Sequence, residues 1–369
     1  MSRNAKPPFR AEHVGSLLRP PELRQAFRQF SNGEIDAPAF TAIQDAAIAK
    51  AVQMQEAIGF GLATDGEFRR ASYWSPVIDA VAGLTIRPAS FSFRDESGET
   101  LGFIAPYVEA KLCRRRGIAT TDYVFLAKTV RNAVPKITLP TPSTFHFWRG
   151  PDAYDRAAYS DVAELLDDVA AIFRAELAEL AALGCRYVQL DEVALIMLAD
   201  PEIRRAVTER GEDPDRLAGL YIEAINAAVA GRPADMRIGL HMCRGNFRGK
   251  FLSAGGYDVI AERVFSETAI DILFLEYDSE RAGDFAPLRL LPPGKSAVLG
   301  IMSSKSPELE SVDYLSRRIA AAAKYIPLER LAISPQCGFA SSIGGRPMTE
   351  DQEEGKLKRL VEVARKVWG

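Results

Sequence analysis

Short apolar segments alternate with longer amphipathic segments along almost the whole chain. Apolar residues recur at helical spacing over residues 35–58 and 161–183, and a glycine follows each stretch, which predicts two amphipathic helices with glycine-terminated ends. The apolar segments between the predicted helices are short and bounded by turn residues, which is typical of buried parallel strands. The predicted strands are residues 9–14, 61–64, 135–139, 186–190, 236–240, 271–275, 296–301 and 331–333.

The alternation of strands and helices predicts an α/β fold built on a parallel sheet. Eight such units favour a single (β/α)8 barrel of the TIM type spanning residues 1–369. An open doubly wound sheet would need a glycine-rich phosphate turn after an early strand, and the sequence contains neither GxGxxG nor GxxxxGK[ST]. Residues 80–123 interrupt the pattern and are predicted to form an inserted β-hairpin, with strands at 84–94 and 100–114.

Composition narrows the class of protein. The 369 residues are 47% hydrophobic and 26% charged, and the net charge of −3 offers no basic surface for nucleic acid. We find no apolar run long enough to span a bilayer and no apolar signal-peptide core at the N-terminus, so we expect a cytoplasmic protein without a membrane partner. The four cysteines are too widely spaced to suggest a secreted disulfide framework.

Polar residues collect immediately after the predicted strands, which in a barrel all open onto one face. His241 and Cys243 lie two residues apart at one strand end, so their side chains point the same way, and this pair suits zinc. The alternative is a buried histidine beside a buried cysteine, both of which are common in protein cores. Glu276 and Cys337 end two further strands and complete a plausible tetrahedral zinc site. Cys113 and Cys185 fit this site poorly.

Five motifs give the chain a specific family resemblance. They are Asp65-Gly66-Glu67-Phe68, Gln189-Leu190-Asp191-Glu192, His241-Met242-Cys243, Glu276 and Pro335-Gln336-Cys337-Gly338. With them the chain, from His13-Val14-Gly15-Ser16 onward, resembles the catalytic C-terminal domain of cobalamin-independent methionine synthase, in a short form without the family's N-terminal half. The resemblance implies a barrel, a zinc ion held by His241, Cys243, Glu276 and Cys337, and homocysteine as the thiol substrate.

The resemblance also implies roles for residues around the metal. Glu67 and Asp191 match positions that hold the substrate's amino group, and Ser16 matches one that contacts its carboxylate. The structural alternative is that these carboxylates pair with nearby arginines. Lys305 occupies the position of the family's catalytic histidine, which makes it the candidate catalytic residue. A lysine donates a proton or binds an anion, but it shuttles protons at neutral pH only if its pKa falls.

The resulting hypothesis is a zinc-dependent S-methyltransferase of methionine biosynthesis that activates homocysteine as a zinc thiolate. The methyl donor stays open between methyltetrahydrofolate, a methylated corrinoid protein and a small methyl compound. A thiol alkyltransferase of the epoxyalkane–coenzyme M transferase type is a close alternative. A metal-free barrel enzyme resembling uroporphyrinogen decarboxylase, and a barrel that binds a thiol or zinc without turnover, are the other classes considered.

Overall fold

A parallel sheet forms the centre of the computed structural model, which describes residues 8–94, 100–245, 251–340 and 348–369. Six strands pair in the order β10-β9-β8-β7-β6-β5, so each strand lies beside its neighbour in sequence. They are β5 (Ile137–Pro140), β6 (Tyr187–Glu192), β7 (Arg237–Met242), β8 (Ile272–Glu276), β9 (Ser296–Met302) and β10 (Leu331–Pro335). All five pairings are parallel, which confirms the predicted sheet type.

Two further predicted strand segments form parallel pairs outside this six-stranded sheet or at its edge. Strand β1 (Leu62–Ala63) pairs in parallel with β4 (Val134–Pro135), which directly precedes β5, and Ala11 forms a parallel bridge to Ile333 of β10. All eight predicted strand segments therefore lie in parallel pairs. Between residues 9–14 and β1, the described residues show no backbone hydrogen bond, and the Thr64 hydroxyl instead donates to the Gly15 carbonyl at 2.7 Å. Closure of the sheet into a barrel therefore stays a prediction.

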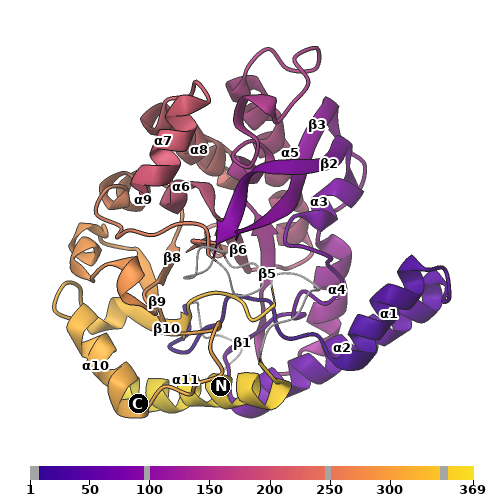
Figure 1. Ribbon diagram of the computed structural model, residues 1–369. Helices are drawn as coiled ribbons and strands as arrows, with labels where there is room; N and C mark the ends of the chain where they lie inside the picture. Colours follow the sequence, from indigo (N-terminus) through magenta and orange to yellow (C-terminus); the bar gives the residue numbers. More distant parts are fainter. Residues whose placement is uncertain (1–7, 95–99, 246–250, 341–347) are drawn as a thin grey trace.

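Helices surround the strands (Figure 1). They are α1 (Pro21–Ser31), α2 (Ala37–Ile58), α3 (Ser75–Ala80), α4 (Thr120–Thr129), α5 (Val162–Ala182), α6 (Ala194–Met197), α7 (Pro201–Glu209), α8 (Pro214–Val229), α9 (Ala261–Glu267), α10 (Val312–Ala322) and α11 (Glu350–Trp368). Local sequence explains the bounds of the longest ones. Asp36 and Asp161 cap the N-termini of α2 and α5, and Gly59 ends α2 with φ of 101°, which glycine adopts without steric cost. No helix of the described residues is long and apolar enough to cross a membrane.

The segment around residues 80–123 contains the predicted hairpin. Strands β2 (Val81–Arg94) and β3 (Thr100–Arg114) pair antiparallel, while the predicted turn at residues 95–98 lies outside the described residues. The hairpin is fastened to the loop after β5, since the Ser90 amide donates to the Trp148 carbonyl at 2.8 Å and Val108 bridges Tyr154. This attachment places the hairpin beside the carboxyl ends of the parallel strands.

Candidate metal and substrate site

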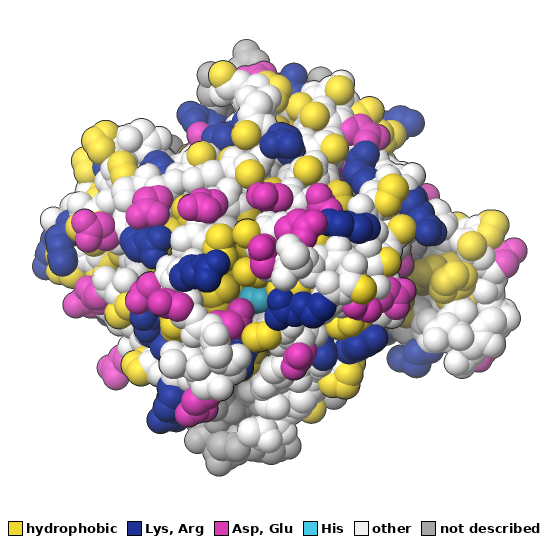
Figure 2. Space-filling view, turned by 90° about the horizontal axis from the view of Figure 1, so that it is seen from above, with side chains coloured by type: hydrophobic (Ala, Val, Ile, Leu, Met, Phe, Trp, Pro, Cys, Tyr) yellow, Lys and Arg dark blue, Asp and Glu magenta, His cyan; other side chains and the backbone are white. Residues whose placement is uncertain are grey.

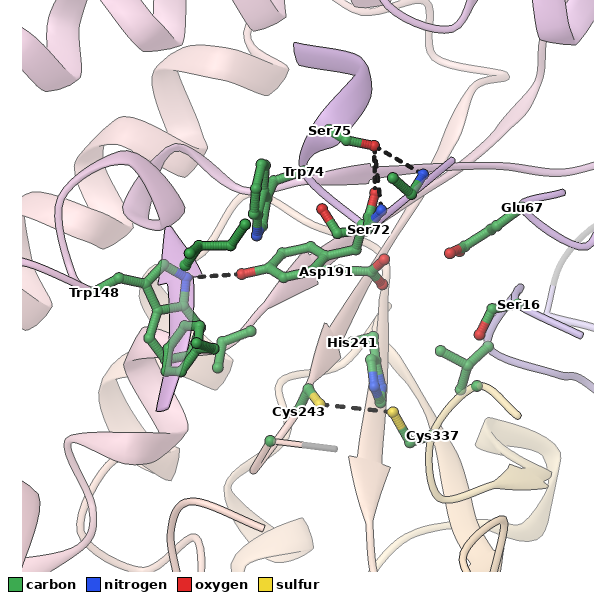
Figure 3. A pocket seen from close by; sticks show the side chains of 18 of the residues that line it. Ser16, Glu67, Ser72, Trp74, Ser75, Trp148, Asp191, His241, Cys243 and Cys337 are labelled. Carbon is green, nitrogen blue, oxygen red and sulfur yellow. Dashed lines mark hydrogen bonds between the residues drawn. The ribbon is translucent and has the colours of Figure 1, made fainter. Parts of the chain in front are cut away.

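A cavity of about 500 Å³ lies where the carboxyl ends of the strands meet the hairpin. Figure 3 shows His241, Cys243 and Cys337 along one side of this cavity, Glu67 and Ser16 on another, and two tryptophans opposite them. The space-filling view in Figure 2 shows acidic and basic side chains interspersed over one face of the molecule, without a large patch of either sign. This face offers no large charged patch, and the candidate reactive side chains lie in the cavity.

Four potential metal ligands converge at the bottom of the cavity, and three of them line it, namely His241, Cys243 and Cys337. His241 is the penultimate residue of β7 and Cys243 directly follows this strand, Glu276 ends β8, and Cys337 lies two residues beyond β10. One potential ligand atom from each residue lies within 4.8 Å of all the others. The two Sγ atoms are 3.6 Å apart, and two thiolates bound at about 2.3 Å to one tetrahedral metal would be about 3.8 Å apart. The cysteine pair thus already has the separation that zinc requires.

The hydrogen bonding of this cluster is incomplete without a cation. Both ring nitrogens of His241 and Oε2 of Glu276 are buried and lack a hydrogen-bond partner among the described residues. Such atoms are costly to bury unless a ligand satisfies them. The hydrogen bond to Cys337 and burial raise the pKa of the Cys243 thiol well above its usual value, and burial raises the pKa of Glu276. A bound divalent cation would supply the missing partner and hold these ligands in their deprotonated forms.

Backbone contacts fix the ligands on their strands. The Cys243 amide donates to the Glu192 carbonyl at 2.8 Å, which continues the β6–β7 pairing beyond the strand end. The Arg244 amide donates to Oε1 of Glu276 at 3.1 Å, and the Tyr257 hydroxyl accepts from the Glu276 amide at 2.8 Å. One carboxylate oxygen of Glu276 is therefore held, while the other is free to face a metal. Tyr257 was not predicted, because nothing in the sequence links it to β8.

Two carboxylates occupy the cavity beside the ligand cluster. Asp191 accepts from Gln189 Nε2 at 2.7 Å, and Glu67 accepts from the Thr138 hydroxyl at 2.8 Å. Burial, followed by repulsion from Glu67, raises the pKa of Asp191 to about 7. The predicted arginine pairing exists only in part: Arg70 approaches Oε1 of Glu67 at 3.7 Å but donates to Thr138 at shorter distances. Among the described residues Asp191 has no ion-pair partner and Glu67 has only this long contact, so both carboxylates are able to accept from a ligand ammonium group.

The loop carrying Glu67 is held in a strained conformation. Glu67 has φ of 60°, in the left-handed region that non-glycine residues rarely adopt, and Gly66 before it has φ of 66°. Arg19 holds this loop by donating to the carbonyls of Glu67 and Arg70, each at 2.8 Å. Such strain persists only where surrounding contacts enforce it, and here those contacts aim the Glu67 side chain into the cavity.

Ser16 also lines the cavity, in close contact with the loop after β10. The Phe339 amide donates to the Ser16 carbonyl at 2.9 Å, which joins the two loops. A Cβ atom added to Gly338 would lie 2.0 Å from Ser16 Oγ, so only glycine allows this approach. Ser16, Glu67 and Asp191 therefore line the same cavity as His241, Cys243 and Cys337.

Lys305 lies near Glu276, behind the wall of the cavity. It follows β9 and is not among the described residues that line the cavity. Its Nζ atom is buried and has no hydrogen-bond partner among the described residues, and its charge lowers the pKa of Glu276, against the larger effect of burial. Cys113 is exposed on β3 and Cys185 is buried outside the cluster. Lys305 thus acts electrostatically on a candidate metal ligand from outside the cavity.

Aromatic side chains form the remaining wall, which the sequence did not predict. Tyr73 and Trp74 precede α3, and Phe103 comes from β3. Trp148 Nε1 donates to the Tyr73 hydroxyl at 2.9 Å, and the rings of Phe103 and Trp148 meet edge to face at 4.8 Å. The adjacent pairs Tyr73-Trp74 and Phe147-Trp148 in loops were the available signal, because a loop seldom carries two large aromatic residues without a packing or binding role.

The fold and the side-chain cluster define a parallel α/β protein with a candidate metal site at the carboxyl ends of its strands. Residues 9–366 match the family model described as "Cobalamin-independent synthase, Catalytic domain". The chain belongs to this family of cobalamin-independent methionine synthases, as the sequence motifs predicted.

Individual relatives and a solved structure are similar over most of the chain. The chain is 37% identical to "Uncharacterized protein YxjH" of Bacillus subtilis (strain 168), over 99% of this chain and 96% of that protein. It is 26% identical to the "Methionine synthase" of Pyrococcus abyssi, over 88% and 85% of the two chains. The solved structure of a candidate vitamin-B12-independent methionine synthase from Listeria monocytogenes is 29% identical and covers 99% of this chain and 100% of that one, with a TM-score of 0.78.

Proposed function

We propose that this protein is a zinc-dependent S-methyltransferase that methylates homocysteine to methionine. The observation that carries the proposal is the placement of two features in one cavity. A Cys₂-His-Glu cluster with unsatisfied polar atoms lies next to a carboxylate pair that lacks a full cationic partner. An amino acid that carries both a thiol and an ammonium group would satisfy the two together.

The residues that would hold zinc are His241, Cys243, Glu276 and Cys337. When bound, zinc would remove the proton from a coordinated thiol and keep the sulfur nucleophilic near neutral pH. Because four protein ligands fill a tetrahedron, one must yield or the shell must expand when a substrate sulfur arrives. Glu276 is the ligand we expect to yield, since a hard carboxylate is the weakest match for this metal and Arg244 already holds one of its oxygens.

The carboxylates and Ser16 would orient the amino-acid part of the substrate. Asp191 and Glu67 would accept hydrogen bonds from the ammonium group, which would stabilise the ionised form of Asp191 that burial disfavours. Ser16 would donate to the substrate carboxylate. For Lys305 we propose a positioning role, in which its buried ammonium offsets the negative charge of Glu276 and the two thiolates. We further propose that the eight strand segments close into a (β/α)8 barrel around the site.

The alternatives receive less support. A sulfonated thiol, as in the coenzyme M alkyltransferases, would need cationic partners, whereas the charged groups beside the cluster are carboxylates. A tetrapyrrole decarboxylase would bind its polyanionic substrate with arginines, and none of the described residues lining the cavity is Lys or Arg.

The test combines metal analysis with a methylation assay. Protein purified without chelators should contain one zinc per chain, and a CD₃-labelled methyl donor should give labelled methionine from homocysteine in a zinc-dependent manner. Coenzyme M, assayed in parallel with an epoxide and with the same methyl donor, distinguishes the alkyltransferase alternative. Absence of zinc after loading, or zinc-independent turnover, would contradict the proposal.

A further inference from the structure

The cavity is divided into two chemically different halves. The half next to β1 and β6 carries Ser16, Glu67 and Asp191, which we assign to the amino acid. The opposite half is aromatic and aliphatic, with Tyr73, Trp74, Phe103, Ile104 and Trp148. Figure 3 shows the cysteine and histidine side chains between these halves, with the tryptophans on the side away from Glu67 and Ser16. A methyl donor that approaches the sulfur must therefore occupy the aromatic half.

The two tryptophan rings of this half are largely shielded from water. Trp74 is 6% exposed and Trp148 is 3% exposed. The hydrogen bond from Trp148 to Tyr73 and the edge-to-face contact with Phe103 restrict the Trp148 ring. Rigid, desolvated aromatic rings bind cations through their π-electron faces, and an aromatic cage is the usual recognition element for methylated onium groups.

The charges of the cavity favour a cation as well. The described residues that line it include Glu67 and Asp191 but no Lys or Arg. Two thiolates and one carboxylate would leave a bound Zn²⁺ with a net charge of −1. The amino acid contributes no net positive charge once its own carboxylate is counted. Arg70, Lys136 and Lys305 offset part of this charge from behind the wall. The charged side chains among the described lining residues are acidic, so the wall that a donor touches favours a cation.

From these observations we propose that the methyl donor is a small methylsulfonium compound, bound in the aromatic half of the cavity against Trp74 and Trp148. This inference rests on the proposed function and adds the chemical class of the second substrate. The cavity volume of about 500 Å³ accommodates homocysteine together with a compact donor.

The transfer balances without any further reactant. The homocysteine sulfur forms a bond to the methyl carbon, the bond from that carbon to the sulfonium sulfur breaks, and its electron pair stays on the departing sulfur. A thiolate and a cation become two neutral thioethers, so no proton has to be delivered to the leaving group. The absence of a proton transfer fits the position of Lys305, which is not among the described residues that line the cavity. Charge is also neutralised in the transition state, which an apolar wall favours over water.

A donor panel tests the proposal on the zinc-loaded full-length enzyme. Trimethylsulfonium, tetramethylammonium, methyltetrahydrofolate and methylcobalamin are compared at equal concentration, with labelled methionine measured by mass spectrometry. Iodomethane is the uncharged reference, because its reaction requires only an activated thiolate. We expect turnover with trimethylsulfonium, and kcat/KM at least tenfold lower with tetramethylammonium, whose amine is a poorer leaving group.

The outcomes separate this inference from the proposed function. Zinc-dependent methylation by iodomethane without turnover of trimethylsulfonium would overturn the inference and leave the proposed function standing. Faster turnover of tetramethylammonium, methyltetrahydrofolate or methylcobalamin than of the sulfonium would also overturn it. No zinc-dependent methylation with any donor would contradict both.

Variants at Trp74 test the aromatic contribution. Trp74→Leu should lower the ratio of kcat/KM for trimethylsulfonium to that for iodomethane by about tenfold, while Trp74→Phe, which keeps a π face, should lower it less. Phe30→Leu is the matched control, because Phe30 is 42% exposed on α1 and does not line the cavity. An equal loss with both donors in Trp74→Leu would indicate a merely structural role and contradict the cation recognition.

Discussion

Asp191→Asn is the substitution that tests the carboxylate pair most directly. It removes one buried charge and keeps the shape of the side chain, and the carbonyl oxygen of the new amide would still accept from Gln189 Nε2. If Asp191 exists to bind an ammonium group, its charge must cost stability in the free protein. The substitution should then stabilise the free protein and weaken substrate binding, which is the opposite of what loss of a structural ion pair would do.

The size of the effect follows from the pKa of Asp191. Burial and repulsion by Glu67 raise this pKa from 3.8 to about 7. At about 1.4 kcal/mol per pH unit, the ionised form costs up to about 4 kcal/mol of folding free energy. The folded state binds more protons than the unfolded state between about pH 4 and pH 7, so this contribution destabilises the protein as the pH rises through that window and is constant above it.

Thermal unfolding of the zinc-free protein measures this difference. An unfolding entropy of about 2.1 cal/mol/K per residue over 369 residues gives about 0.8 kcal/mol/K, so the melting temperature at pH 8 should rise by up to about 5 °C in Asp191→Asn. The gain should shrink as the pH falls toward 4. The KM for homocysteine should rise about 10- to 100-fold at pH 8. A lower melting temperature at pH 8 with an unchanged KM would refute the assigned role.

Three further substitutions address the other parts of the site. Cys337→Ser should lose stoichiometric zinc and activity together by metal analysis and turnover, whereas Cys113→Ser, at an exposed cysteine, should keep both. Lys305→Met should move the pH for half-maximal zinc binding upward in a titration, because the Lys305 charge lowers the pKa of Glu276. Lys305→Arg, which keeps the charge, should restore the original pH. The same pH in Lys305→Met as in the unmodified protein would exclude the electrostatic role. Gly338→Ala should raise the KM for homocysteine several-fold at unchanged zinc content, because the new Cβ would displace Ser16 Oγ. Gly355→Ala in α11, where the structure leaves open space, should leave KM unchanged.

The parallel sheet could be predicted because burial on both faces leaves short apolar segments that contrast with the amphipathic helices. Helix bounds are harder to predict. Apolar spacing over residues 257–264 suggests a helix from residue 257, but α9 begins at Ala261, since the residues before it form turns that still carry apolar side chains. Closure of the barrel was predicted from the eight units and stays a prediction, because it depends on two short segments, residues 9–14 and β1. In the described residues these segments contact through the Thr64 hydroxyl rather than through a backbone ladder.

The candidate ligand cluster could be predicted because parallel strands bring their carboxyl ends to one face, so polar strand ends distant in sequence must meet. The structure brings together the four predicted ligands, His241, Cys243, Glu276 and Cys337. The aromatic half could not be predicted in the same way. Tyr73, Trp74 and Trp148 lie in loops, whose path periodicity does not specify, and the position of Lys305 outside the cavity likewise depends on a loop.

The residues that form the wall of the aromatic half lie close together in the sequence. Apart from Trp148 and Val193, it comes from one uninterrupted stretch, residues 71–104, whereas the metal ligands and amino-acid contacts are scattered from Ser16 to Cys337. A single exchange of residues 71–114 between two relatives would therefore transplant most of one substrate compartment and leave the thiol-activating compartment untouched. Such chimeras would test whether donor preference moves with this segment. The same arrangement would allow natural recombination to change the donor while the thiol substrate is conserved.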